Sequence, residues 1–235
     1  MPKGTLFLIP VPLAENTVKR VLTDWQFQLI NKIDTYIVEN EKTGRFWLKN
    51  MGLQIAQSEL TMHVYGKHSE KNDLSGYFVE LEMGKDVGLM SEAGCPAIAD
   101  PGADIVAEAH RRQIPVHPMV GPSSILLSLM ASGFNGQSFT FHGYLPIDKS
   151  QRAKKLRELE MMADRYHQTQ IFIETPFRNN QLLDDILKAC HPHTRLCVSC
   201  NLTAADEQII SLTVEQWRKQ KVDLHKKPSI FLLFK

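Results

Sequence analysis

The chain has 235 residues, a formal net charge of +1, 43% hydrophobic residues and 23% charged residues. This length can bury a full hydrophobic core, either as one large domain or as two small ones, and the composition fits a soluble globular protein. No apolar run approaches membrane-spanning length, so we expect no membrane partner, and the near-neutral charge means that nucleic-acid binding must rest on local basic patches.

The first residues, Met1 to Gly4, lead directly into a strand-like run, so we expect a cytoplasmic protein without a signal peptide. Hydrophobic spacing then predicts strands that alternate with helices. The expected elements are a strand at 5–9, a helix at 16–25, a strand at 33–38, a helix at 46–51, a strand at 61–65 and a helix at 73–83.

Residues 87–133 form the most informative stretch of the chain. A buried strand is expected at 87–90, followed by a loop of small residues at 91–102 and a helix at 104–112. A strand at 116–119 then leads through Gly121 into a second helix. Small side chains let a flat ligand lie against the backbone, and ligands of open α/β sheets bind beyond the carboxyl ends of the strands. The alternative is that both loops are tight turns without a ligand.

In the second half, strands are expected at 139–143, 170–173, 197–202 and 229–234. The likeliest boundary lies between Pro118 and Gly121, which divides the chain into an N-terminal α/β domain, 1–119, and a C-terminal α/β domain, 120–235. The fold class is therefore predicted to be α/β, with two domains.

Three motifs carry a resemblance to a known family. They are S-E-A-G-C-P-A-I-A-D-P-G at 91–102, V-G-P-S-S at 120–124 and F-H-G-Y-L-P at 141–146. Together they resemble the tetrapyrrole methylase superfamily of S-adenosylmethionine (SAM) methyltransferases, and within it the branch of the bacterial 16S ribosomal RNA ribose 2′-O-methyltransferases. The resemblance covers nearly the whole chain and is most specific in its middle third. It implies a homodimer with SAM in a cleft between the two domains, acting on ribosomal RNA or the small ribosomal subunit.

The resemblance also implies a set of cofactor-binding residues. They are Pro10, Glu92, Ala93, Gly94, Cys95, Ala97, Ile98, Gly121, Pro122, Ser123, Ser124, Glu174, Leu202, Thr203 and Pro228. The sequence departs from the branch after the first strand, where Leu13-Ala14-Glu15 replaces the usual Gly-Asn-Leu. The motifs that imply SAM binding are nevertheless better preserved than the motifs that imply substrate binding.

The substrate half is implied by shorter matches. Glu39 matches the first residue of a Glu-Asp-Thr-Arg motif, and Lys42 keeps its positive charge; Arg178 matches the last residue of Glu-Ser-x-His-Arg. We therefore expect Glu39 and Arg178 to be catalytic, with Glu39 as the general base or acceptor for a ribose hydroxyl. The alternatives are a solvated strand end around Glu39 and a salt bridge between Glu39 and Arg178.

RNA contacts are expected from four side chains. His68 begins a sequence that resembles the His-Asn-Glu motif of the branch, while Lys149 and Arg152 open the densest cationic segment, and Lys42 completes the set. The alternatives are that His68 caps a helix and that the cationic segment is a solvated helix face.

Four cysteines are present, and three of them lie in the run from Cys190 to Cys200. Because residues three apart on a strand point to opposite faces, Cys197 and Cys200 should diverge, and there is no second CxxC. We therefore expect free thiols and no metal site.

Three classes of function remain: a SAM methyltransferase of structured RNA, a SAM methyltransferase of a small molecule such as a tetrapyrrole, and a divergent SAM-binding protein with weak or no catalysis. Dinucleotide and nucleoside-triphosphate enzymes are disfavoured. The sequence has no GxGxxG after the first strand and no GxxxxGK[ST] anywhere.

Overall fold

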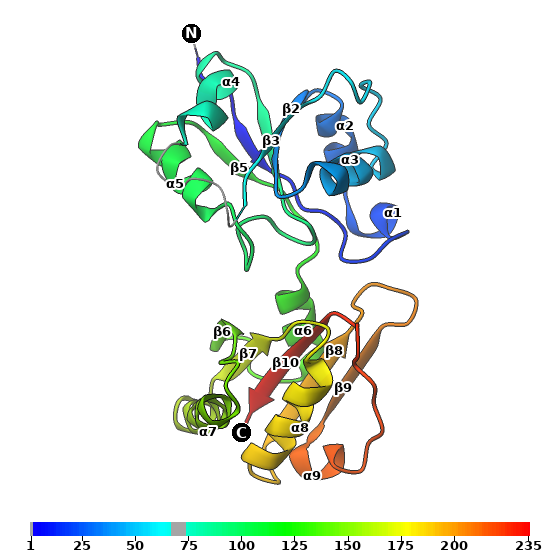
Figure 1. The fold of residues 1–235 in the computed structure, drawn as a ribbon, viewed down its shortest axis with the longest axis vertical. Helices are drawn as coiled ribbons and strands as arrows, with labels where there is room; N and C mark the ends of the chain where they lie inside the picture. The colour runs from blue at the N-terminus through cyan, green and yellow to red at the C-terminus, as the bar shows by residue number, and fades with distance from the viewer. Residues whose placement is uncertain (1, 67–73) are drawn as a thin grey trace. The chain divides into compact units, whose positions relative to one another are not determined.

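The structure is a computed structural model that describes residues 2–66 and 74–235. His68 lies outside the described residues. The chain forms two compact units, Met1–Ser123 and Ser124–Lys235, each with its own sheet (Figure 1). In the part of the chain that is described, no helix is long and apolar enough to cross a membrane.

The first unit is built on a five-stranded, fully parallel sheet in the order β3-β2-β4-β1-β5. Its strands are β1 (Leu6–Leu8), β2 (Thr35–Val38), β3 (Thr61–Val64), β4 (Val87–Met90) and β5 (Val116–Pro118). Every residue of β2 and β4 is buried, as expected for central strands of a parallel sheet that is covered on both faces.

Helices cover both faces of this sheet. They are α1 (Val18–Val21), α2 (Asp24–Ile30), α3 (Glu41–Asn50), the 3-10 helix η1 (Ser75–Phe78), α4 (Val79–Glu82) and α5 (Ala103–Arg111). One core cluster contains Ile30 and Trp47 from α2 and α3, and a second contains Phe78 and Ile105 from η1 and α5. Two clusters divided by one sheet are the arrangement of a doubly wound α/β layer.

The second unit has a mixed sheet in the order β6-β7-β10-β8-β9, in which only β6 and β7 are parallel. Its strands are β6 (Phe139–Tyr144), β7 (Thr169–Ile173), β8 (Arg195–Cys200), β9 (Gln208–Thr213) and β10 (Ser229–Phe234). Its helices are α6 (Ser124–Ser132), α7 (Lys149–Tyr166), α8 (Asn179–Ala189) and α9 (Val214–Trp217).

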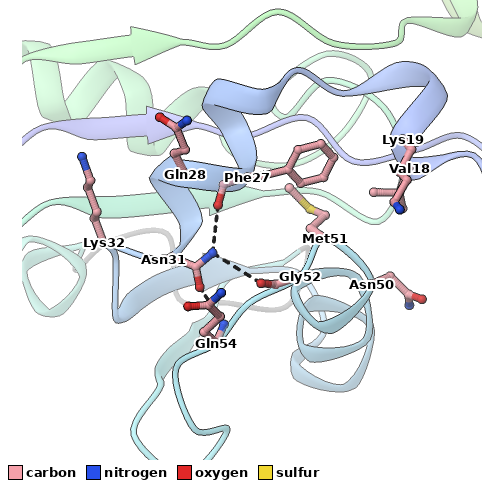
Figure 2. Close-up of a pocket in the computed structure, with 10 residues that line it drawn as sticks. All are labelled: Val18, Lys19, Phe27, Gln28, Asn31, Lys32, Asn50, Met51, Gly52 and Gln54. Atoms are coloured by element: carbon pink, nitrogen blue, oxygen red, sulfur yellow. Dashed lines mark hydrogen bonds between the residues drawn. The ribbon is translucent and has the colours of Figure 1, made fainter.

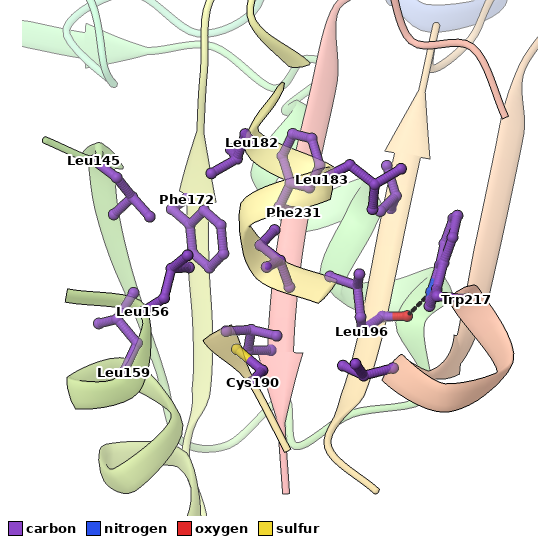
Figure 3. Close-up of a cluster of buried hydrophobic side chains, with 14 of the residues drawn as sticks. Leu145, Leu156, Leu159, Phe172, Leu182, Leu183, Cys190, Leu196, Trp217 and Phe231 are labelled. Atoms are coloured by element: carbon purple, nitrogen blue, oxygen red, sulfur yellow. Dashed lines mark hydrogen bonds between the residues drawn. The ribbon is translucent and has the colours of Figure 1, made fainter. Parts of the chain in front are cut away.

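Side chains of β10 pack on both faces of this sheet, because successive residues of a strand point to opposite sides. Phe231 stacks on Phe172 with ring centroids 6.1 Å apart, in the cluster that also holds Trp217 (Figure 3). Ile230 and Leu232 belong instead to the cluster with Ile125 and Leu129 of α6. The predicted α/β class with two α/β units is confirmed.

In two of the predicted helices, the bounds change where caps start new helices. The helix expected at 16–25 is divided at Thr23, whose backbone N–H donates to Gln26 Oε1 at 2.7 Å in a capping box that opens α2. The helix expected at 46–51 begins earlier, at Glu41, because Asn40 Oδ1 accepts the N–H of Thr43 at 3.2 Å. The segment after Glu39 is therefore the start of a helix.

Gly88 in β4 is required by the ring of Tyr36 on the neighbouring strand. A Cβ at position 88 would lie 2.6 Å from Tyr36 Cδ1 and 2.9 Å from Ile9 Cδ1. The Tyr36 hydroxyl lies 3.0 Å from the carbonyl oxygen of Ile30, so the ring is held where it stands. The close packing of this sheet depends on the missing side chain.

We predict that Gly88→Ala destabilises the first unit by about 1–3 kcal/mol, because the added methyl overpacks a rigid site. Differential scanning calorimetry measures the loss as a lower melting temperature. Gly76→Ala is the matched control, since a Cβ there meets no atom within 4 Å. Equal melting temperatures for the two variants would contradict this account of the packing.

Candidate functional site

The carboxyl ends of the five parallel strands meet at one edge of the first sheet, and the turn after β1 is hydrogen-bonded there to the loop after β4. Val11 N–H donates to Gly94 O at 2.9 Å, and Gly94 N–H donates to Val11 O at 3.0 Å. This isolated antiparallel bridge fixes the middle of the loop at 91–102 against the segment that contains Pro10.

The segment after β5 packs on the same place. A Cβ on Gly121 would lie 2.2 Å from Pro10 Cβ, so the backbone of Gly121 touches the proline ring directly. Cys95 Sγ lies 3.4 Å from Pro122 O, which joins the same segment to the loop after β4. Predicted cofactor residues from three separate segments are thus brought together within the first unit.

The loop after β4 has an unusual backbone. Gly94 and Gly102 have φ of +75° and +125°, and two alanines, Ala97 and Ala99, each have φ of +65°. A left-handed alanine costs free energy and persists where the surroundings impose it, and such residues cluster at ligand-binding sites. Since an alanine side chain ends at Cβ, the loop leaves its peptide groups open to a ligand.

Glu39 lies at the same edge, directly after β2, and is half-buried. Its Oε1 accepts the backbone N–H of Glu92 at 3.4 Å, while Trp47 Nε1 donates to Glu92 O at 3.2 Å. The backbone of Glu92 is therefore held through both its N–H and its carbonyl oxygen. Lys42, in the first turn of α3, is exposed three residues after Glu39.

Most of the remaining predicted cofactor residues lie in the second unit. Because β10 is antiparallel to β7 and β8, its start lies beside their ends, and Asn201 N–H donates to Pro228 O at 3.0 Å. This places Glu174, Leu202, Thr203 and Pro228 at one edge of the second sheet. Ser123 ends the first unit, and Ser124 is the first residue of α6.

Thr203 is the most constrained residue at this second edge. Its φ is +70°, and its N–H donates to Glu207 Oε2 at 2.6 Å. Its hydroxyl oxygen is buried and, within residues 2–66 and 74–235, has no hydrogen-bond partner. A buried hydroxyl without a partner is costly, so this atom is available to a ligand.

Arg178 is joined to Glu174 in the same unit. Its Nε and Nη2 donate to Glu174 Oε1 at 2.9 and 2.6 Å, and Thr175 N–H donates to the same oxygen at 2.6 Å. The Glu174 side chain is 2% exposed and that of Arg178 is 36% exposed. Arg178 thus neutralises a buried carboxylate and keeps an outer surface for other contacts.

The prediction that Arg152 contacts RNA is wrong. The residue is 2% exposed, and its Nε and Nη2 donate to Asp185 Oδ2 at 2.9 and 2.6 Å. Its Nη1 donates to the carbonyls of Pro146 and Ile147. Arg152 therefore anchors the segment before α7, and no donor group faces solvent. Lys149, the first residue of α7, is exposed as expected.

Three of the four cysteines, Cys190, Cys197 and Cys200, are buried free thiols, and Cys95 is partly exposed. Cys200 lies in the cluster with Phe172, and Cys197 in the cluster on the other face of the sheet, which confirms that their side chains diverge. Burial raises the pKa of Cys190 to about 12 and that of Cys197 to about 11, so both stay protonated at neutral pH. In the described ranges, no group of three His, Cys, Asp or Glu side chains is placed to hold a metal ion.

The fold is shared with a solved structure. The structure is similar to the crystal structure of the methyltransferase CobJ with a TM-score of 0.64 and 14% sequence identity, covering 100% of this chain and 94% of that one. This likeness shows that the two chains share a fold, and an α/β fold with two units is what the sequence predicted. No family model matches the chain.

Curated relatives then identify the branch. The chain is 31% identical over 218 residues to ribosomal RNA small subunit methyltransferase I of Halalkalibacterium halodurans, covering 91% of this chain and 70% of that protein. The relative of the same name from Vibrio cholerae is 27% identical over 212 residues, with 89% and 69% covered. The chain belongs to the ribosomal RNA small subunit methyltransferase I family, and the predicted resemblance is confirmed.

We predict that Arg178→Ala destabilises the second unit by about 1–3 kcal/mol, because it leaves the buried Glu174 carboxylate without its partner. Denaturant unfolding of the full chain measures the loss. The double variant Glu174→Gln/Arg178→Ala should recover part of it, and Lys188→Ala serves as a surface control. If Arg178→Ala is as stable as the control, the ion pair has no role in stability.

Proposed function

We propose that this protein is a SAM-dependent methyltransferase that modifies the ribose 2′-hydroxyl of a cytidine in 16S ribosomal RNA. The observation that carries the proposal is the meeting of the segments after β1, β2, β4 and β5 at one sheet edge. Membership of the ribosomal RNA small subunit methyltransferase I family supports the choice of substrate.

SAM fits the residues present at this edge. We assign to it the backbone of residues 93–98, in which Gly94 and Ala97 have positive φ values and short side chains, together with Gly121 and Pro122. The contact of Gly121 with Pro10 leaves no room for a side chain, so the backbone itself forms this wall. Bound SAM supplies a methyl group on a positively charged sulfur.

Glu39 is the acceptor that we assign to the ribose hydroxyl. A neutral hydroxyl is a poor nucleophile, and a carboxylate within hydrogen-bond reach can take its proton as the new bond forms. The Glu92 N–H fixes the direction of the Glu39 carboxylate, which reduces the freedom lost in reaching the reactive geometry. We assign Lys42, in the first turn of α3, to a neighbouring phosphate.

The formal charge is unevenly divided along the chain, which bears on RNA binding. Residues 1–123 contain 12 Lys and Arg against 15 Asp and Glu, whereas residues 124–235 contain 15 against 11. On α7, Lys149, Lys154 and Arg157 are exposed. We assign phosphate contacts to these three side chains, with Arg178 as a further cation in the same unit.

Transfer of a tritiated methyl group from SAM tests the proposed function. Purified 30S subunits lacking the modification, naked 16S RNA and porphyrinogens are offered separately to the protein. We expect label in 30S subunits or 16S RNA and none in porphyrinogens. Label in porphyrinogens alone would identify a small-molecule methyltransferase, and no label with intact SAM binding would identify a binding protein.

We predict that Gly94→Val lowers the affinity for SAM at least tenfold, or about 1.4 kcal/mol, while the chain stays folded. The φ of +75° is strained for valine, and a Cβ there lies only 3.2 Å from Leu13 Cδ2. Isothermal calorimetry with SAM gives the affinity. Gly136→Val, at a site with open space, is the control. Unchanged SAM affinity in a folded Gly94→Val variant would contradict the assignment of SAM to this loop.

We predict that Glu39→Gln lowers the rate of methyl transfer about a hundredfold or more and leaves SAM affinity near wild type, because only the proton acceptor is lost. Single-turnover transfer and calorimetry measure the two quantities on the same preparation. Glu41→Gln is the matched control, since that carboxylate pairs with Arg45 on the surface of α3. Full activity of Glu39→Gln would place the acceptor elsewhere.

A further inference from the structure

A hollow lies in the first unit, away from the sheet edge described above. It has a volume of about 750 Å³ and is bounded by α1, α2 and the end of α3 (Figure 2). Its residues Lys32 and Gln54 come before β2 and β3, so the pocket lies at the amino-terminal side of these strands. Glu39 follows β2 at the opposite side. Since α3 has ten residues and starts beside Glu39, about 15 Å separates the two sites.

The wall of the pocket is rigid and mostly apolar. Phe27 and Met51 lie next to each other in it (Figure 2). Asn31 fixes this wall: its Nδ2 donates to Phe27 O at 2.9 Å and to Gly52 O at 3.3 Å, and its Oδ1 accepts Gln54 N–H at 2.6 Å. The Asn31 amide therefore ties the end of α2 to the segment after α3.

Two lysines stand at opposite ends of the pocket. Figure 2 shows Lys19 at one side of Phe27 and Lys32 at the other. Both are exposed, and neither forms an ion pair with any residue that the structure describes. Residues 1–123 contain more acidic than basic residues. The two cations beside the apolar wall are therefore a property of this pocket and do not reflect a general positive charge of the unit.

We propose that this pocket binds a nucleotide of the RNA substrate away from the methylated position, an inference that rests on the proposed RNA methyltransferase function. A base stacks against an aromatic ring, and the amide groups of Gln28 and Gln54 suit the polar edge of a base. Cations at both ends fit a chain whose phosphates enter on one side and leave on the other, whereas a free nucleotide carries its phosphates at one end only.

The first test measures binding of a 16S RNA transcript to the full chain at several salt concentrations. For Lys19→Glu/Lys32→Glu we expect at least fivefold weaker binding and a log–log salt slope smaller by about 1–2, since two phosphate contacts are lost. Lys188→Glu/Lys219→Glu, with the same change of charge on the second unit, should keep the wild-type slope. SAM affinity and melting temperature should be unchanged in both. Equal RNA binding by the two double variants overturns the proposal.

The second test asks for contact directly. Photocrosslinking of 4-thiouridine-substituted 16S RNA, followed by trypsin and mass spectrometry, should label the peptide of residues 21–32, which contains Phe27. Phe27→Leu should remove this label. Absence of label on that peptide, while other peptides are labelled, overturns the proposal and leaves the proposed function intact.

A third arm separates RNA from a free nucleotide. Calorimetry with cytidine, uridine and adenosine monophosphates should give no binding below millimolar concentration. Tight, lysine-dependent binding of a monophosphate without an effect on RNA affinity would make the pocket a small-ligand site and overturn the RNA assignment. If the wild-type chain neither binds nor methylates ribosomal RNA, the proposed function fails first and the pocket proposal fails with it.

Discussion

The pair of backbone hydrogen bonds between Val11 and Gly94 is the constraint on which the candidate site depends. It closes the turn after β1 onto the loop after β4, and it forms because Gly94 adopts a φ that disfavours side chains. The contact of Gly121 with Pro10 adds the segment after β5. Gly94 and Gly121 thus allow three chain segments to pack closely at this edge of the sheet.

In each unit, the fold itself holds polar groups at the strand ends. Asn40 caps α3 directly after β2, so the helix starts beside Glu39, and Trp47 from the same helix holds the Glu92 carbonyl. In the second unit, Glu174 and Arg178 neutralise each other at the end of β7. In each unit, hydrogen bonds therefore hold an acidic side chain at a strand end in a fixed direction.

Much of the fold was predictable from sequence because buried strands are continuous apolar runs. The strands at 87–90 and 229–234 have the predicted bounds, and the opposite directions of Cys197 and Cys200 followed from the period of two. The helix starts that follow Thr23 and Asn40 were not predicted, although Thr23 and Gln26 have the spacing of a capping box. Apolar periodicity alone does not detect such polar caps.

The assignment of Arg152 to RNA failed because charge was given more weight than position. Arg152, Leu156, Leu159 and Ala163 recur at helical spacing and are all buried, so the sequence already places the arginine on the inner stripe of α7. Its partner, Asp185, is 33 residues away on α8, and no local pattern reveals that pairing. The pair of Glu174 and Arg178, at i and i+4, could have been predicted from the sequence.

Mapping ribose methylation on ribosomal RNA tests the central claim most directly. RNA from cells with and without this gene is compared by alkaline cleavage, since a 2′-O-methyl group protects the adjacent phosphodiester. The account predicts that protection at one cytidine of 16S RNA is lost without the gene and returns when the gene is supplied. Identical cleavage patterns in the two strains would contradict it.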